Sequence, residues 1–123
     1  MTQEDKQLLL VDLCGRLPYG VKIELMPVTR GKCATLTPII LYDYYISDDV
    51  NYLPYLRPIS SMTEEEDKEF ALLQVNVHRA DILYAIDCIK VIEWLNKHHF
   101  DFRGLISKGL AIEVTEKNNP YKE

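Results

Sequence analysis

The chain has 123 residues, of which 47% are apolar and 27% charged, and its net charge is −5. This composition is typical of one small folded soluble domain. Residues 63–69 hold five acidic and one basic side chain, so they supply −4 of the net charge and the rest of the chain is nearly neutral. This distribution excludes a broad basic surface for a phosphate backbone, and it is too weakly acidic to imitate DNA.

The cysteines and the first residues predict the cellular setting. Cys14, Cys33 and Cys88 are far apart and show no spacing typical of a metal site. Cys14 and Cys88 lie on predicted apolar helix faces, where we expect buried free thiols. The polar start MTQEDKQ has no signal- or transit-peptide pattern, and no apolar run reaches the ~18 residues of a membrane span. We therefore expect a cytoplasmic protein outside the membrane, with no metal and no cofactor.

The first part of the chain predicts a helix and then a strand. Apolar residues recur at three- and four-residue spacing over 3–16, and Thr2 with Asp5 forms a capping pattern at the start. Alternating apolar and polar residues over 21–26 predict a half-buried strand. Residues 28–34 contain Arg-Gly-Lys, which we interpret as a hairpin tip, with a phosphate-binding turn as the alternative.

The middle of the chain is rich in aromatic and β-branched residues. Residues 35–46, TLTPIILYDYYI, predict a second strand with Pro38 at its irregular start. Residues 50–58 contain two prolines, so we expect an extended segment that crosses the surface rather than a central strand.

Two further helices are predicted, over 64–75 and 79–99. Thr63 and Glu66 form a capping box, and the acidic residues around them suit a helix N-terminus, so the acidic stretch needs no ligand to explain it. The second helix carries a broad apolar surface, which predicts that it is clamped between other layers. Its main apolar face consists of Ile82, Ala85, Ile86, Ile89, Ile92 and Leu95.

The end of the chain completes the predicted fold. Residues 110–114 predict a short strand, and 115–123 are polar with one proline and are expected to fray. We predict a single α+β domain over 1–123. Its helices pack on a small, mainly antiparallel sheet built from strands over 21–26, 35–46 and 110–114.

The tyrosines around the middle of the chain are one candidate binding site. We expect Tyr42 and Tyr44 to share a strand face and Tyr45 to point to the other side. Tyrosine at a sheet edge is the simplest interpretation; a protein interface and a surface that stacks bases are the alternatives. Asp43, Asp48 and Asp49 lie in the same stretch, and their negative charge would repel the backbone of a nucleic acid. The candidate set is Tyr42, Tyr44, Tyr52, Tyr55 and Arg57.

The end of the long helix is the other candidate site. Adjacent helical residues such as His98 and His99 point in different directions, so they do not easily bind one metal ion. We interpret them as a helix-end cap with packing contacts. Asp101 and Arg103 are expected to fix the turn through a salt bridge or hydrogen bonds to free helix carbonyls, with a binding role as the alternative. No residue is assigned as catalytic.

Three segments carry a resemblance to a known group of proteins. They are LLLVDLCGRLPYGVKIEL, YLRPISSMTEEE and VIEWLNKHHFDFRGLISKGLAIEV, and together they cover about half of the chain. The chain resembles small uncharacterised proteins of phages, prophages and mobile elements of gut anaerobic bacteria. The resemblance implies an accessory protein in a bacterial cytoplasm and carries over no catalytic residue.

Three functions remain open from the sequence. The first is a non-enzymatic accessory protein that binds a host or phage protein, with the tyrosine segment as its contact surface. The second is a nucleic-acid-associated regulator or replication accessory, which predicts salt-dependent retention on DNA. The third is a small hydrolase or nuclease that uses His98, His99 and Asp101, which requires those side chains to converge on a cleft.

Overall fold

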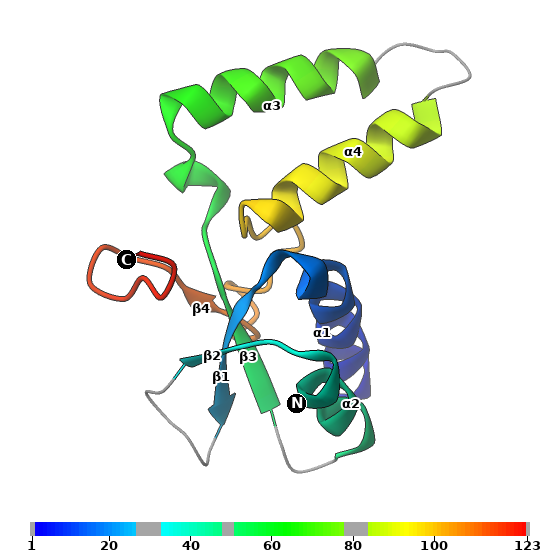
Figure 1. Cartoon of the computed structure of the whole chain (residues 1–123), viewed down its shortest axis with the longest axis vertical. Helices are drawn as coiled ribbons and strands as arrows, with labels where there is room; N and C mark the ends of the chain where they lie inside the picture. Colours follow the sequence, from blue (N-terminus) through cyan, green and yellow to red (C-terminus); the bar gives the residue numbers. More distant parts are fainter. Residues whose placement is uncertain (1, 27–32, 48–50, 78–83, 123) are drawn as a thin grey trace.

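The computed structural model describes residues 2–26, 33–47, 51–77 and 84–122. Within these ranges it contains four α-helices and a four-stranded mixed sheet, so the predicted α+β class is confirmed. Figure 1 shows α1 and α2 beside the sheet, with α3 and α4 together at the other end of the molecule. The elements are α1 (Gln3–Arg16), η1 (Leu17–Tyr19), β1 (Lys22–Met26), β2 (Cys33–Thr35), α2 (Pro38–Ile46), β3 (Asn51–Leu56), η2 (Ile59–Ser61), α3 (Glu64–Val77), α4 (Tyr84–Lys97) and β4 (Ile112–Glu113).

The central part of the sheet is β3. The strand order is β2-β1-β3-β4; β1 is antiparallel to both of its neighbours, whereas β4 is parallel to β3. The prediction that 50–58 is a surface segment rather than a central strand is therefore wrong. Pro54 lies opposite Ile23 of β1, and β4 pairs only with Tyr55 and Leu56. The edge of β3 turned away from β1 has no strand partner at Pro54, so a residue without an N–H is tolerated there.

Residues 35–46 form a helix for most of their length, so the predicted strand there is wrong. Within this stretch Thr35 alone belongs to a strand, as the last residue of β2. Thr37 is the N-cap of α2, with its hydroxyl accepting from the Ile40 N–H at 3.3 Å, and Pro38 occupies the first turn, where its missing N–H costs nothing. This start signal outweighs the strand propensity of the residues that follow. The predicted hairpin tip within 28–34 falls mostly outside the described residues.

Two apolar clusters hold the fold together. The larger joins α1, the sheet, α2 and the chain after α4, and its buried members are Leu9, Leu13, Val21, Ile23, Leu36, Tyr44, Tyr52, Leu56, Leu105 and Leu110. The smaller joins α3 to α4, with Trp94, Leu95 and Phe100 buried and Phe70 and Leu73 packed against them. We call α1, α2, the sheet and the chain after α4 the body, and α3 with α4 the helix pair. The two parts therefore have separate apolar cores.

The helix α4 is less enclosed than its sequence predicts. Its last turn meets α1 so closely that a Cβ on Gly15 would lie 3.1 Å from Nδ2 of the buried Asn96. Farther along the same face, Ile92 is 43% exposed and Ile89 is 54% exposed. The predicted clamp between layers is wrong for these two residues, because α4 extends with α3 beyond the end of α1 (Figure 1).

The cysteines also differ from expectation. Cys14 and Cys33 are exposed and Cys88 is half-buried. The predicted burial of Cys14 is wrong, because the buried side of α1 carries Leu9, Leu13 and Arg16 instead. None of the helices in the described ranges combines the length and the apolar character that crossing a bilayer requires.

Candidate functional site

The loop after α4 is closed by backbone hydrogen bonds around His99. His99 adopts a φ of 64°, the left-handed conformation that often ends a helix. The Phe100 N–H donates to the Leu95 carbonyl at 2.9 Å, and the Phe100 side chain is fully buried. The Arg57 N–H donates to the His99 carbonyl at 2.7 Å, and the Asp101 N–H donates to the Arg57 carbonyl at 2.8 Å. The helix end is therefore joined directly to the chain that leaves β3.

Asp101 and Arg103 have different partners in this loop. The two Asp101 carboxylate oxygens accept from the N–H groups of Leu105 and Ile106, each at 2.9 Å. Arg103 Nη1 donates to Asp12 Oδ1 at 2.7 Å, which ties the loop to α1. Asp101 orders the turn, and Arg103 fixes its position on the body.

A buried charge cluster lies between α1 and the loop. The side chains of Asp12 and Arg16 are fully buried, with Arg16 Nε donating to Asp12 Oδ2 at 2.8 Å. Arg16 Nη2 also donates to the Phe100 carbonyl at 2.6 Å. Arg103 pairs with the same carboxylate, so two guanidinium groups share one acidic group. This cluster combines a buried ion pair with direct hydrogen bonds, the arrangement that buried charges require.

The two adjacent histidines contact different parts of the molecule. The His98 ring lies 4.4 Å from the Trp94 ring, and its Nδ1 is 3.4 Å from Glu66. The His99 ring stacks on Tyr121 at 3.9 Å with an interplanar angle of 10°. Burial, together with the charges of Arg16 and Arg57, lowers the pKa of His99 to about 4, so this ring is neutral at pH 7. The structure does not bring the two rings to a shared site.

Arg57 anchors the chain after β3 to the first turn of α3. Its guanidinium donates to both Glu66 oxygens, at 2.7 and 2.8 Å, and lies 4.2 Å from the Phe100 ring centre. The predicted capping box is present: the Thr63 N–H donates to Glu66 at 2.9 Å, and the Glu66 N–H donates to the Thr63 hydroxyl at 3.2 Å. Hydrogen bonds from Arg57, opposed by burial, lower the pKa of Glu66 to about 2. Arg57 is thus engaged within the protein.

Most of the tyrosines proposed from the sequence are internal. Tyr44 and Tyr52 meet edge to face in the core, with ring centres 5.9 Å apart. Tyr55 is buried and donates its hydroxyl to Glu24 at 3.2 Å. Burial raises the pKa of Tyr44 to about 12, and burial with the nearby Glu24 raises that of Tyr55 to about 12. Of the four proposed tyrosines, Tyr42 alone is exposed, so the structure does not bring this set together on one surface.

An exposed apolar helix face surrounds Tyr42 instead. Ile39, Tyr42 and Ile46 recur at three and four residues on α2, and Tyr45 lies one turn after Tyr42. These four residues, here called the α2 face, are between 58% and 75% exposed, whereas Tyr44 is buried on the opposite side. Only Tyr42 among them was proposed from the sequence. The capping residue Thr37 followed by proline was the signal that would have placed this stretch on a helix.

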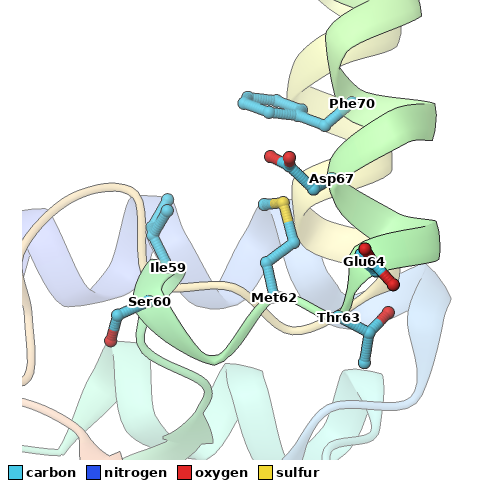
Figure 2. A pocket seen from close by; sticks show the side chains of 7 residues that line it. All are labelled: Ile59, Ser60, Met62, Thr63, Glu64, Asp67 and Phe70. Carbon is cyan, nitrogen blue, oxygen red and sulfur yellow. The ribbon is translucent and has the colours of Figure 1, made fainter.

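A pocket of about 470 Å³ lies between η2 and the start of α3 (Figure 2). Its lining combines apolar and acidic side chains, and it is here called the η2–α3 pocket. The lining residues are Ile59, Ser60, Met62, Thr63, Glu64, Asp67 and Phe70. From the sequence, we interpreted the acidic residues as suited to a helix N-terminus, and Glu66 does form the capping box there. No sequence pattern indicated that Glu64 and Asp67 would border a pocket.

A second pocket, of about 420 Å³, lies beside the last residues of the described chain. It is lined by Arg57, Ser61, Val114, Thr115, Glu116, Asn119 and Lys122. Its arginine is already paired with Glu66, and Glu116 brings a further negative charge. Lys122 is the other cation of the lining, and Glu116 offsets its charge, so the pocket provides no strong positive site for an anion.

The described residues contain no group of three or more His, Cys, Asp or Glu side chains that could hold a metal ion. Two surfaces of the described residues are suited to a ligand, the α2 face and the η2–α3 pocket. Comparisons with protein-family models, with curated proteins and with solved structures find no match to this chain.

Proposed function

We propose that this chain is a non-enzymatic accessory protein that binds a protein partner through the α2 face. One observation carries the proposal: four large apolar side chains stand in solvent on a single nine-residue helix. Ile39 is 75% exposed and Tyr42 is 62% exposed. Leaving such a cluster in water is unfavourable, and clusters of this kind mark surfaces that another molecule covers.

The chemistry of the α2 face favours a protein over a nucleic acid. Tyrosine and large aliphatic residues are typical of the centre of protein interfaces. Asp43 is exposed on the same helix, and the chain has a net charge of −5, so a phosphate backbone would be repelled. The resemblance to small phage and mobile-element proteins supports a partner from the host or the phage, in the bacterial cytoplasm.

The helix-end residues favour a non-enzymatic role. The His98 ring packs at a tilt against Trp94, the His99 ring stacks on Tyr121, and the two rings have separate surroundings. Asp101 and Arg103 are occupied by backbone N–H groups and by Asp12, respectively. A hydrolase or nuclease that uses these side chains would need them to converge on a substrate, and their present partners hold them apart.

An affinity pull-down from the native host, followed by mass spectrometry, tests the proposal. The tagged protein is expected to recover one stoichiometric partner, and the double variant Ile39→Ser/Tyr42→Ser is expected to lose it. Leu72→Ser is the matched control, because Leu72 is 70% exposed but lies on α3, away from α2. Thermal unfolding shows whether all three proteins fold alike. Recovery of the partner by the folded double variant would contradict the proposal.

A further inference from the structure

The η2–α3 pocket has an apolar wall held in place by its neighbours. Phe70 stacks on Trp94 with ring centres 5.3 Å apart, and Trp94 Nε1 donates to Glu69 at 3.3 Å. Met62 packs against the same cluster, and Ile59, 42% exposed, lies across from it (Figure 2). The wall therefore presents a phenyl ring, a thioether and an aliphatic side chain, all suited to a hydrocarbon chain.

Two carboxylates border this wall. Figure 2 shows the Asp67 carboxylate between Met62 and Phe70, on the same side of α3 as the Phe70 ring, with Glu64 at the start of α3. Within the described residues, neither carboxylate has a hydrogen bond or an ion pair. Glu66, on the same turn, differs because Arg57 neutralises it. The pocket thus combines an apolar wall with two carboxylates, Glu64 and Asp67, that have no cationic partner among the described residues.

A long cationic side chain matches both features. The methylene stem of lysine or arginine is apolar and covers hydrophobic surface, while the charged head seeks an anionic oxygen. A cation near Phe70 would also meet the negative face of the ring. A pocket of about 470 Å³ has the volume typical of ligand sites and exceeds what one small ion would fill. An anionic ligand would be repelled by both carboxylates.

We infer that the η2–α3 pocket docks a lysine or arginine side chain from a basic segment of a partner protein. The stem lies against Met62 and Phe70, and the head donates hydrogen bonds to Asp67 and Glu64. This site is independent of the α2 face, because Figure 1 places α2 and α3 at opposite ends of the molecule. The inference can therefore fail while the proposed function holds, and the reverse is also true.

Capped tripeptides provide the test. Alanyl-lysyl-alanine and alanyl-arginyl-alanine are titrated into the 15N-labelled protein, and amide shifts are followed by NMR at millimolar peptide, where single-residue contacts become measurable. Alanyl-norleucyl-alanine is the control with the same stem and no charge. The cationic peptides are expected to give saturable shifts confined to residues 59–70, and the norleucine peptide is expected to give much weaker ones.

Matched variants separate the pocket from general attraction to acidic residues. Asp67→Asn is expected to weaken binding of the lysine peptide by about tenfold, as expected for one charge-assisted hydrogen bond. Glu65→Gln also removes one negative charge from the first turn of α3, but Glu65 lies outside the pocket. The affinity of this variant for the lysine peptide is therefore expected to stay near that of the parent protein. Equal loss in both variants, equal binding of the norleucine peptide, or no saturable shift at residues 59–70 would each overturn the inference.

Discussion

The sheet-centred body and the α3–α4 pair are held together by different contacts. In the body, ten buried apolar residues from helices, strands and the chain after α4 form one cluster. Between α3 and α4, the buried apolar side chains of the described part are Trp94, Leu95 and Phe100, all near the end of α4 that meets the body. Farther out, Leu72 and Ile89 remain in solvent.

The difference shows how local stability is distributed. Among the described side chains of the helix pair, few apolar ones are buried. One ion pair, Arg57 with Glu66, fastens the base of the pair to the chain after β3. Segments with so little burial open at a lower free energy than the whole protein. The charge cluster of Asp12, Arg16 and Arg103 belongs to the body. It also fixes the loop that follows α4, and so the end of that helix.

Removing the shared carboxylate of the charge cluster should have the largest effect. Asp12→Ala leaves Arg16 buried without its anion and is expected to lower the free energy of unfolding by about 3–5 kcal/mol, measured by chemical denaturation. Glu4→Ala is the control, because Glu4 is an exposed acid on the same helix. A loss of less than about 1 kcal/mol would mean that the body does not depend on this cluster.

Acid should weaken the contacts of His99 before it weakens the ion pair of Glu66 with Arg57. The folded state lowers the pKa of His99 from 6.5 to about 4, so the unfolded chain binds a proton first. Stability is therefore expected to fall, by on the order of 2 kcal/mol, as pH drops from 6.5 toward 4. The Glu66 contribution, with its pKa lowered from 4.5 to about 2, is lost only as pH falls below 4.5.

The variant His99→Asn tests this pH dependence, since asparagine tolerates the left-handed backbone but does not titrate. Its denaturation midpoint is expected to change less between pH 6.5 and 4.5 than that of the parent. Parallel slopes in the two proteins would show that His99 is not the group responsible.

Loosening the base of the helix pair should separate the two regions most clearly. Glu66→Gln removes the carboxylate that Arg57 holds and is expected to cost about 1–2 kcal/mol. Hydrogen exchange in α3 and α4 should accelerate, while amides of β1 and β3 keep their protection. Glu65→Gln, an exposed neighbour, should change neither region. Uniform acceleration across both regions would show that they unfold as one unit.

Changing the outer surface of the helix pair should matter least. Leu72→Ser replaces a side chain that is 70% exposed, so the free energy of unfolding is expected to change by less than about 0.5 kcal/mol. Leu73→Ala, at the next position but packed against the Trp94 cluster, is expected to cost about 2 kcal/mol or more. Similar effects from the two changes would contradict the placement of the helix interface.

The capping residues in the sequence predicted where two of the helices begin. The helix at α1 follows its Thr2 cap and the helix at α3 follows its capping box, and both are present. The stretch at 35–46 misled because strand propensity depends on a surface to pair with, whereas Thr37 and Pro38 had already started a helix.

Long-range contacts were beyond the reach of such signals. The position of β3 depends on pairing with residues 23 and 112, whereas the two prolines of 50–58 had argued against a central strand. The partner of Arg103 is Asp12, 91 positions away, and nothing near either residue in the sequence indicates it. The prediction that Tyr42 shares a strand face with Tyr44 is wrong. Only the helix shows that the exposed neighbours of Tyr42 are Ile39, Tyr45 and Ile46.

The parallel pairing of β4 with β3 has a consequence for synthesis of the protein. The final contacts of the sheet come from the far end of the chain: β4, and Tyr121, whose hydroxyl donates to the Tyr55 carbonyl at 2.7 Å and accepts from the Lys22 N–H at 2.9 Å. On the ribosome, β3 can join β1 early, but its second edge stays unpaired until these residues emerge. For that interval the nascent chain carries an open strand that neighbouring nascent chains can pair with, so aggregation during translation should depend on how fast residues 57–121 are made.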